Sequence, residues 1–381
     1  MASLTSPGGL TLERPQRGRP RLDWWLVAVT AALMTAGLMA LYSQGLDDKG
    51  GLYFRKQLLF VALGAVPFLL FALVNPNVWL RGAKVLYGLN LAALLAVLVV
   101  GRHGGGAERW IQIGPMSFEP SELSKLLTAL TLGAFLTVRR QEIRSLSTFF
   151  LSLAHVGVPI LLILKQPHLG AALVMMVIWC AMCLVARMSP KLVLGTIGLM
   201  AIVILVAVKV PGIRQHVLKG YQAGRVNSLL GNDTLGSNYQ TLRAEIAFGE
   251  GGLLGSGYLH GEQKAGRYVP DQNTDFVFSV IGEEGGLIGC TLVLIMYGFF
   301  FYRIWLIAIR AEDFFNRLVC AGLLSMLAFQ TLVNLAMELQ LAPVVGLWLP
   351  FMSYGGSAIW LCMASVGLLL NLRGKQKPIL F

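Results

Sequence analysis

Residues 24–43 have the sequence WWLVAVTAALMTAGLMALYS, which contains no Asp, Glu, Lys or Arg. A run of about 20 predominantly apolar residues is long enough, as an α-helix, to cross the ~30 Å hydrocarbon core of a bilayer. It is also longer than the apolar part of a secretory signal peptide. The residues before it are rich in Pro, Gly and Arg. We therefore predict that residues 24–43 form a first transmembrane helix and not a cleaved signal.

The composition of the whole chain extends this prediction. Apolar residues make up 56% of the 381 residues and charged residues only 13%, whereas soluble globular domains carry about 25% charged residues. At ~20 residues a span, such a chain can cross a bilayer roughly ten times with modest loops. A soluble globular fold is excluded. The net charge of +12 then raises the question of which loops hold the cations.

We predict an all-α polytopic integral membrane protein of about ten transmembrane helices. The predicted spans lie at 24–43, 57–75, 84–100, 122–138, 147–164, 169–186, 191–210, 275–302, 317–338 and 344–371. The eighth and tenth stretches are long, and Gly or Pro inside them is expected to break or tilt the helices. All five cysteines lie in apolar runs, where we expect small buried side chains and no zinc site.

Lys and Arg are unevenly shared between the two sets of loops, and this bias sets the orientation. One set of short connections, with both termini, holds more than half of the 31 cations. These cations are Arg14, Arg17, Arg19, Arg21, Arg81, Lys84, Arg139, Arg140, Arg144, Arg187, Lys191, Arg303, Arg310, Arg317, Arg373, Lys375 and Lys377. Since cytoplasmic loops carry the excess, both termini are predicted to be cytoplasmic, which an even number of spans requires.

The predicted domain organisation follows from these spans. A disordered cytoplasmic tail at 1–23 precedes a single transmembrane domain at 24–372, and a second cytoplasmic tail occupies 373–381. The long connection at 210–274 is placed outside the membrane. Because it keeps apolar residues among its glycines, we expect it to be ordered and partly re-entrant.

An ionisable group at membrane depth is a functional-site hypothesis by default, and the first such place is PSELSK at 120–125. Pro120, Ser121 as a possible cap and Glu122 in the first turn are typical of a helix start. Glu122 and Lys125 are three residues apart, so they share a helix face and can pair. A cap with a surface pair is the alternative. We favour a paired site in a polar cavity, because Lys125 lies a turn inside the apolar run.

The second place is Asp275, where the long outer segment enters the eighth span. A carboxylate there is partly desolvated, which raises its pKa toward the range useful for a general base. An N-terminal helix cap is the alternative, and the two roles are compatible.

Two further places lie in the last third of the chain. Adjacent Glu283 and Glu284, in GEEGG at 282–286, are hard to explain as packing, and at least one should reach a cation or backbone N–H groups. They either support an active site or lock the span to the outer loop. The stretch LPFMSYGGS at 349–357 predicts a broken helix, because it combines Pro and Gly-Gly within an apolar run.

The outer segment offers cations and glycines that suit an anion. Its cations are Arg214, Lys219, Arg225, Arg243, Lys264 and Arg267. The glycine clusters at 249–252 and 255–257 would let backbone approach an anion closely. Together they predict a phosphate-bearing ligand, with a simply solvated basic loop as the alternative.

These motifs, taken in order, resemble the SEDS family (shape, elongation, division and sporulation), most closely its elongation branch, RodA. The resemblance covers nearly all the chain after the N-terminal tail. The matching stretches are RWI (109–111), PSE (120–122) with Lys125, QPHLG (166–170), GSNYQ (236–240), TDF (274–276), GEE (282–284), LPF (349–351) and SYGGS (353–357). The order of the motifs, on the predicted side of the membrane, makes the resemblance specific.

The resemblance implies a peptidoglycan glycosyltransferase. Family members polymerise glycan strands from lipid II on the outer leaflet of the bacterial cytoplasmic membrane, with a class B penicillin-binding protein and other elongation-complex membrane proteins as partners. The essential aspartate of the family falls on Asp275, and its Glu–Lys pair falls on Glu122 and Lys125. The family usually has Asp where this chain has His168, often Lys at Ser256 and commonly Ser at Ala244.

The implied reaction needs a base for a sugar hydroxyl and cations for a departing diphosphate. We assign the base to Asp275, with Glu122, Lys125, Glu283 and Glu284 in support. The diphosphate is assigned to Arg109, Arg225, Arg243, Lys264 and Arg267, and in part to Lys125. No cofactor is assigned; a divalent cation, Mg or Mn, could share the charge, although the sequence has no dedicated metal cage. Direct displacement would invert the anomeric centre.

Other functions stay open at this stage. A transporter or lipid flippase would use acid–base pairs near the midplane and broken helices in matched positions. A non-catalytic scaffold is a third reading. Within the family, the division member FtsW is the close alternative, while the short termini and Lys165–Gln166–Pro167 favour the elongation type.

Overall fold

The computed structural model describes residues 22–45, 51–104, 107–113, 116–209, 237–266 and 268–373. Its long helices are α1 (Trp24–Gly45), α2 (Leu52–Leu73), α4 (Ala83–Val100), α5 (Pro120–Val138), α6 (Leu146–Lys165), α7 (Leu169–Val185), α8 (Pro190–Lys209), α13 (Val277–Arg310), α14 (Phe314–Glu338) and α15 (Gly356–Arg373). The shorter helices are α3 (Pro76–Arg81), η1 (Arg140–Glu142), α11 (Ser237–Gly251) and α12 (Glu262–Ala265). Three strands, β1 (Arg102–Gly104), β2 (Ala107–Ile113) and β3 (Met116–Phe118), form an antiparallel sheet.

The helical membrane-protein fold is confirmed, because each of the ten predicted spans overlaps one of the long helices. Seven of the described helices are long and apolar enough to cross a membrane by length and composition, and α4, α7 and α8 contain shorter apolar helices. The side of the membrane on which residues 210–274 and the termini lie stays a prediction. Residues 1–21, 210–236 and 374–381, which include most of both predicted tails and part of the outer segment, lie outside the described residues.

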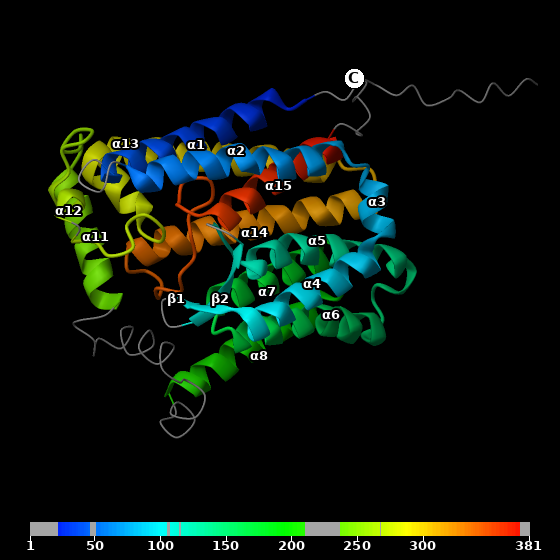
Figure 1. Ribbon diagram of the computed structural model, residues 1–381. Coiled ribbons are helices and arrows are strands. Elements are labelled where there is room, and N and C mark those ends of the chain that lie inside the picture. The colour runs from blue at the N-terminus through cyan, green and yellow to red at the C-terminus, as the bar shows by residue number, and fades with distance from the viewer. Residues whose placement is uncertain are drawn as a thin grey trace, which may run out of the picture.

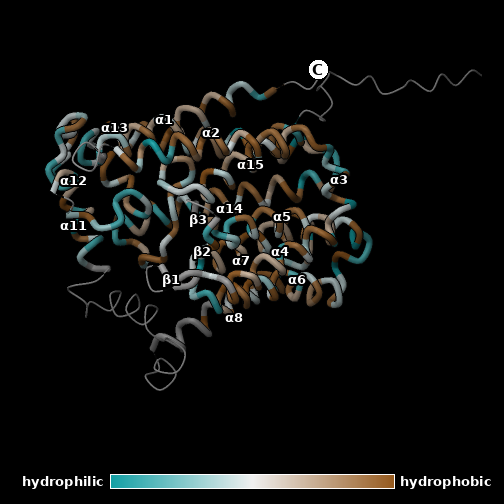
Figure 2. Tube along the Cα trace, viewed as in Figure 1, coloured by the Kyte–Doolittle hydropathy of each residue, from teal (hydrophilic) through white to brown (hydrophobic). Residues whose placement is uncertain are grey.

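The long helices lie side by side along a common direction (Figure 1). Helices α11 and α12 occupy one end of this bundle, whereas α3, the start of α1 and the end of α15 lie at the other end. Hydrophobic residues follow the helices, and hydrophilic residues gather in the connections and around α11 and α12 (Figure 2). This distribution suits a bundle whose middle contacts hydrocarbon and whose ends contact water.

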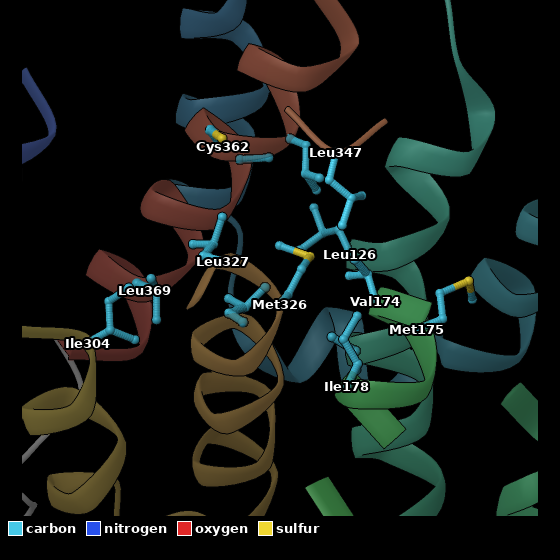
Figure 3. Close-up of a cluster of buried hydrophobic side chains, with 14 of the residues drawn as sticks. Leu126, Val174, Met175, Ile178, Ile304, Met326, Leu327, Leu347, Cys362 and Leu369 are labelled. Atoms are coloured by element: carbon cyan, nitrogen blue, oxygen red, sulfur yellow. The ribbon is translucent and has the colours of Figure 1, made fainter. Parts of the chain in front are cut away.

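The core is formed where α5, α7, α14 and α15 meet. Leu126, Val174, Ile178 and Met326 are fully buried there, as the close-up shows (Figure 3). Beside this core, α2 packs closely along α15. A Cβ atom at Gly367 would come within 2.3 Å of a backbone oxygen of α2, so this small residue is what allows the two helices to approach.

Both predicted helix breaks are present. Gly286, inside α13, has φ 59° and ψ −159°, a left-handed φ that favours glycine. The predicted tenth span at 344–371 is helical only from Gly356, because residues 344–355 form an irregular segment. That segment is buried against protein, with Leu349 and Met352 fully covered, which is the condition under which non-helical backbone is tolerated at membrane depth.

Three local features differ from the expectations and alternatives that the sequence offered. The residue that caps α5 is Glu119, so Ser121 lies inside the helix. The N-cap of α13 is Phe276, so Asp275 is not the cap of that helix. The three strands between α4 and α5 were not predicted, because they are only three to seven residues long and pair locally within one connection.

Candidate active site

A cavity of about 480 Å³ lies where the sheet, the start of α5 and the turn before α13 meet. Segments far apart in the sequence converge on it. Its lining residues are Lys56, Phe60, Arg109, Trp110, Ser117, Glu119, Glu122, His168, Asp271, Thr274, Asp275, Gly346, Trp348, Tyr354, Gly355, Gly356, Ser357 and Ala358. The structure therefore brings together Asp275, Glu122 and Arg109, three of the predicted site residues, in one polar space.

Asp275 belongs to a tight turn that leads into α13. The backbone N–H groups of Thr274 and Asp275 both donate to the carbonyl of Asp271, each at 3.0 Å. From the opposite side, the fully buried side chain of Asn334 donates to the carbonyl of Asp275 at 2.7 Å and to that of Leu347 at 2.8 Å. These bonds fix the backbone of the turn and hence the point from which the Asp275 carboxylate projects.

Glu338, one helical turn beyond Asn334, anchors the start of α13. Its two carboxylate oxygens accept the N–H groups of Phe278 at 3.2 Å and Ser279 at 2.6 Å. These are free N–H groups of the first helical turn, where a carboxylate is favourable. Neither Asn334 nor Glu338 was identified from the sequence, although polar residues four apart inside an apolar span are a usable signal.

The predicted Glu122–Lys125 pair is present on α5. The Lys125 ammonium lies 2.7 Å from Oε1 of Glu122, and both side chains are buried. Lys125 also lies 5.3 Å from the centroid of the Trp348 ring. The other carboxylate oxygen of Glu122 is buried and has no hydrogen-bond partner among the described residues. Glu122 also lines the cavity. One of its carboxylate oxygens is therefore paired with Lys125, and the other has no described hydrogen-bond partner.

A second polar pair at the cavity was not predicted. The His168 ring lies 2.9 Å from the Glu119 carboxylate, and Ser121 donates to Glu119 at 2.9 Å. Burial acts to raise the pKa of Glu119, but the His168 and Lys125 charges and the hydrogen bonds outweigh it, so the pKa lies below its usual value. His168, the residue that departs from the family pattern, therefore has a carboxylate partner here.

Among the described residues, the cations that line the cavity are Lys56 of α2 and Arg109 of β2. Arg109 donates to the backbone carbonyls of Gln166 and Pro167, which ties the sheet to the connection before α7. The role of Lys56 was not predicted, because nothing in the sequence singles out this residue among the loop cations. The guanidinium of Arg243, by contrast, stacks between the rings of Tyr239 and Tyr268, about 5 Å from each, and is not among the described lining residues.

The other predicted site residues lie elsewhere. Lys264 is buried and pairs with Glu284 at 2.6 Å, and Ser43 of α1 donates to the same carboxylate. Glu283 accepts the backbone N–H groups of Gln263 at 2.7 Å and Lys264 at 3.1 Å. This arrangement locks α12 onto α13, and none of these three charged residues is among the described residues that line the cavity. Their role toward the ligand stays a prediction from the sequence. Arg225 and Arg267 lie outside the described residues.

The glycine clusters of the outer segment also lie against α13. A Cβ atom at Gly255 (φ 82°) would come within 2.1 Å of the carbonyl oxygen of Glu284. The backbone N–H and the hydroxyl of Ser256 both donate to the backbone carbonyl of Glu283. Close backbone packing, and not an open anion cradle, explains glycine at this position.

Among the described residues, no group of three or more His, Cys, Asp or Glu side chains is placed to hold a metal ion.

Comparison with known proteins gives consistent results along the whole length. The model of a family described as "Cell cycle protein", that of FtsW, RodA and SpoVE, matches residues 21–378. Stage V sporulation protein E of Bacillus subtilis is 35% identical over 362 residues, covering 92% of this chain and 96% of the relative. Peptidoglycan glycosyltransferase MrdB of Escherichia coli is 32% identical over 360 residues, covering 94% and 95%.

The fold is shared with solved structures as well. A chain of a peptidoglycan synthase complex, described as coordinating polymerization and crosslinking, aligns with a TM-score of 0.77. The two chains are 32% identical, and the alignment covers 92% of this chain and 97% of the other. At this identity and coverage the likeness extends to the whole helical bundle.

Proposed function

We propose, from the premise that this chain belongs to the FtsW, RodA and SpoVE family of cell cycle proteins, that it is a peptidoglycan glycosyltransferase and polymerises lipid II in the cavity described above. The observation that carries the proposal is the convergence of Asp275, Glu122, Arg109 and Lys56 on one cavity from four separate segments. A carboxylate and cations in the same space are what the reaction requires.

In the proposed reaction, the 4-hydroxyl oxygen of one sugar attacks the anomeric carbon of another. As the new C–O bond forms, the Asp275 carboxylate takes the hydroxyl proton. The bond between the anomeric carbon and the diphosphate breaks, and the polyprenyl diphosphate leaves with the electron pair. A single displacement of this kind inverts the anomeric centre and forms no covalent enzyme intermediate.

Arg109 and Lys56 are the described cations that we assign to the departing diphosphate, because both line the cavity. Arg225 and Arg267 stay proposals from the sequence. Lys125 is neutralised by Glu122 at 2.7 Å, so its contribution is to hold that carboxylate at the wall of the cavity. Lys264 is left out of the assignment, since Glu284 takes its charge.

The setting of the activity rests on the family resemblance. We propose that the chain works at the outer face of the bacterial cytoplasmic membrane, during cell elongation, with a class B penicillin-binding protein as transpeptidase. The likeness to a chain of a peptidoglycan synthase complex supports a partnered enzyme. The FtsW-type division role is the alternative, and depletion separates them: loss of an elongation enzyme gives round cells, and loss of a division enzyme gives filaments.

A lipid flippase is the rival function, and an assay without a bilayer separates the two. The purified chain, with its transpeptidase partner in detergent, should convert lipid II into polymer, which a flippase or a scaffold would not do. Asp275→Asn should abolish polymer formation, whereas Asp313→Asn, at the start of α14 and outside the described lining of the cavity, should retain most of it. Absence of polymer with the parent chain contradicts the activity, and equal rates for the parent and Asp275→Asn contradict the base.

A further inference from the structure

A second cavity, of about 570 Å³, lies near the end of the bundle opposite α11 and α12. It is bounded by the α3–α4 connection on one side and by α5 and α6 on the other. Its volume falls within the range of ligand pockets. It shares none of its lining residues with the cavity that contains Asp275.

The inner wall of this cavity offers no free polar group to an occupant among its described residues. Its apolar lining residues are Leu80, Ala83, Ala134, Phe135 and Val138. The polar groups on the wall are satisfied internally. His155 and Thr131 are hydrogen-bonded to each other at 3.0 Å, and the Tyr87 hydroxyl donates to the carbonyl of His155 at 2.9 Å. Thr137 donates to the carbonyl of Gly133 at 2.7 Å. An occupant of the inner cavity therefore needs no polar groups of its own.

The remaining lining residues are cations. Arg81 and Lys84 are exposed and have no ion pair within the described part of the chain. Arg139 has a loose pair, 3.8 Å from the largely exposed Glu142, and exposed pairs of this kind contribute little. No acidic residue is found among the described residues that line the cavity. The cavity thus carries three positive charges with almost no compensation.

The surroundings of the cavity are those of a membrane surface. On α4, Val85 and Leu89 are exposed apolar residues, and Val138 at the end of α5 is 84% exposed. Exposed apolar side chains at the end of a long apolar helix face lipid and not water. The cavity therefore opens where acyl chains and lipid headgroups meet.

We propose that this cavity binds an anionic phospholipid, with an acyl chain along the C-terminal half of α5 and the phosphodiester against Arg81, Lys84 and Arg139. An anionic headgroup on an acyl chain complements three cations at the edge of an apolar cavity. Cations that only anchor helix ends extend toward bulk water and need no hollow beside them. Here all three line one cavity with an apolar interior. The proposal does not depend on the proposed activity, because the site and its test involve no residue of the Asp275 cavity.

The test measures lipid retained by the full chain. The purified protein in detergent is mixed with phosphatidylglycerol or phosphatidylcholine, and bound lipid is counted by native mass spectrometry. The parent should retain phosphatidylglycerol in preference to phosphatidylcholine. The variant Arg81→Gln/Lys84→Gln/Arg139→Gln should lose that preference, by roughly fivefold in affinity for each cation removed.

A matched variant tests whether the position of the charges matters. Arg140→Gln/Arg144→Gln/Lys191→Gln removes three cations assigned by the charge bias to the same side but outside the cavity lining, and it should keep the preference. Equal losses in the two triple variants would overturn the proposal in favour of a diffuse basic surface. Competition by inorganic phosphate alone, as strong as by the lipid, would also overturn it, since the acyl chain would then be irrelevant.

A third variant covers the case in which the charge variant fails to fold. Ala83→Trp narrows the cavity and leaves every cation in place. It should reduce phosphatidylglycerol retention at an unchanged melting temperature. Full retention by a folded Ala83→Trp protein would show that the cavity is not where the lipid lies.

Discussion

Two buried carboxylate–lysine pairs lie in the described part of the chain, and they differ in what surrounds them. On α13, Oε1 of Glu284 accepts from Lys264, Ser43 and the backbone N–H of Leu259. On α5, Glu122 pairs with Lys125 through one oxygen, while its other oxygen is buried without a partner among the described residues. The first pair joins α12 and α1 to α13, whereas the second reaches the wall of a cavity.

This difference distinguishes an ion pair that holds helices together from an ion pair that belongs to a ligand-binding site. A buried charge costs free energy unless its hydrogen-bonding capacity is met. In the α13 pair, Oε1 of Glu284 accepts from three protein groups, so a structural role is enough to explain it. The α5 pair leaves one buried oxygen without a partner among the described residues, on a side chain that lines a polar cavity. Such an incomplete arrangement is expected where a ligand completes it. We therefore expect opposite responses when each pair is removed.

Replacing both members of a pair by uncharged residues should show the largest difference between the two pairs, measured as the polymerisation rate. Glu122→Gln/Lys125→Met should fold but lose about 10²–10³-fold in polymerisation rate, since it removes preorganised charge beside the reacting atoms. Glu284→Gln/Lys264→Met should keep most of the rate per folded molecule, because an uncharged pair of similar shape can replace a buried ion pair. Rates are measured with lipid II at matched folded protein. Equal losses would remove the distinction between the pairs.

Replacing only one member of the Glu284–Lys264 pair should instead lower the stability of the folded protein. Lys264→Met leaves the Glu284 carboxylate buried without its cation, at an expected cost of about 3 kcal/mol in the free energy of unfolding. The melting temperature in detergent reports this loss, and adding Glu284→Gln should recover most of it. No recovery in the double variant would show that packing, and not charge, sets the stability there.

A smaller effect is expected behind the catalytic turn. Asn334→Ala removes the donor to the carbonyls of Asp275 and Leu347, which costs about 1–3 kcal/mol for buried acceptors left unpaired. If the turn positions the base, the rate should also fall about tenfold at an unchanged lipid II affinity. Asn316→Ala, which removes a side-chain bond to Asp313 at the other end of α14, should leave the rate unchanged.

The smallest effect concerns the Glu119–His168 pair and pH. The pKa of Glu119 in the folded protein lies below its ordinary value of 4.5. The charged Glu119 carboxylate therefore stabilises the folded protein fully at a pH above 4.5. This contribution is lost as the pH falls through the pKa that Glu119 has in the folded protein. Compared with Glu119→Gln, the parent should melt at a higher temperature at neutral pH, and the difference should shrink in acid. A difference that does not change with pH would contradict a charged pair.

Apolar run lengths were enough to predict the helical bundle, and spacing was enough to predict the Glu122–Lys125 pair. Both depend on contacts within one helix, where the period fixes which side chains meet. The break at Gly286 was also predictable, because glycine is the residue that adopts a positive φ without strain.

Contacts between distant segments could not be predicted in this way. Lys264 and Arg243 were assigned to a ligand from charge alone, yet one pairs with Glu284 and the other lies between two tyrosine rings. Lys56 and Glu119 reach the cavity from helix ends whose position depends on the packing of the whole bundle. Spacing along the sequence holds no information on contacts between distant segments. The sequence therefore shows the charge of a residue but not its partner.

We expect Asp275 to take a proton and not merely to bind substrate. Lipid II affinity and single-turnover polymerisation, measured on the same preparation of Asp275→Asn, test this role most directly. The affinity should stay within a few-fold of the parent, and the rate should be lower by at least about 10²-fold, the usual contribution of a general base. A rate that falls only as far as the affinity does would contradict the role of base and make Asp275 a binding residue.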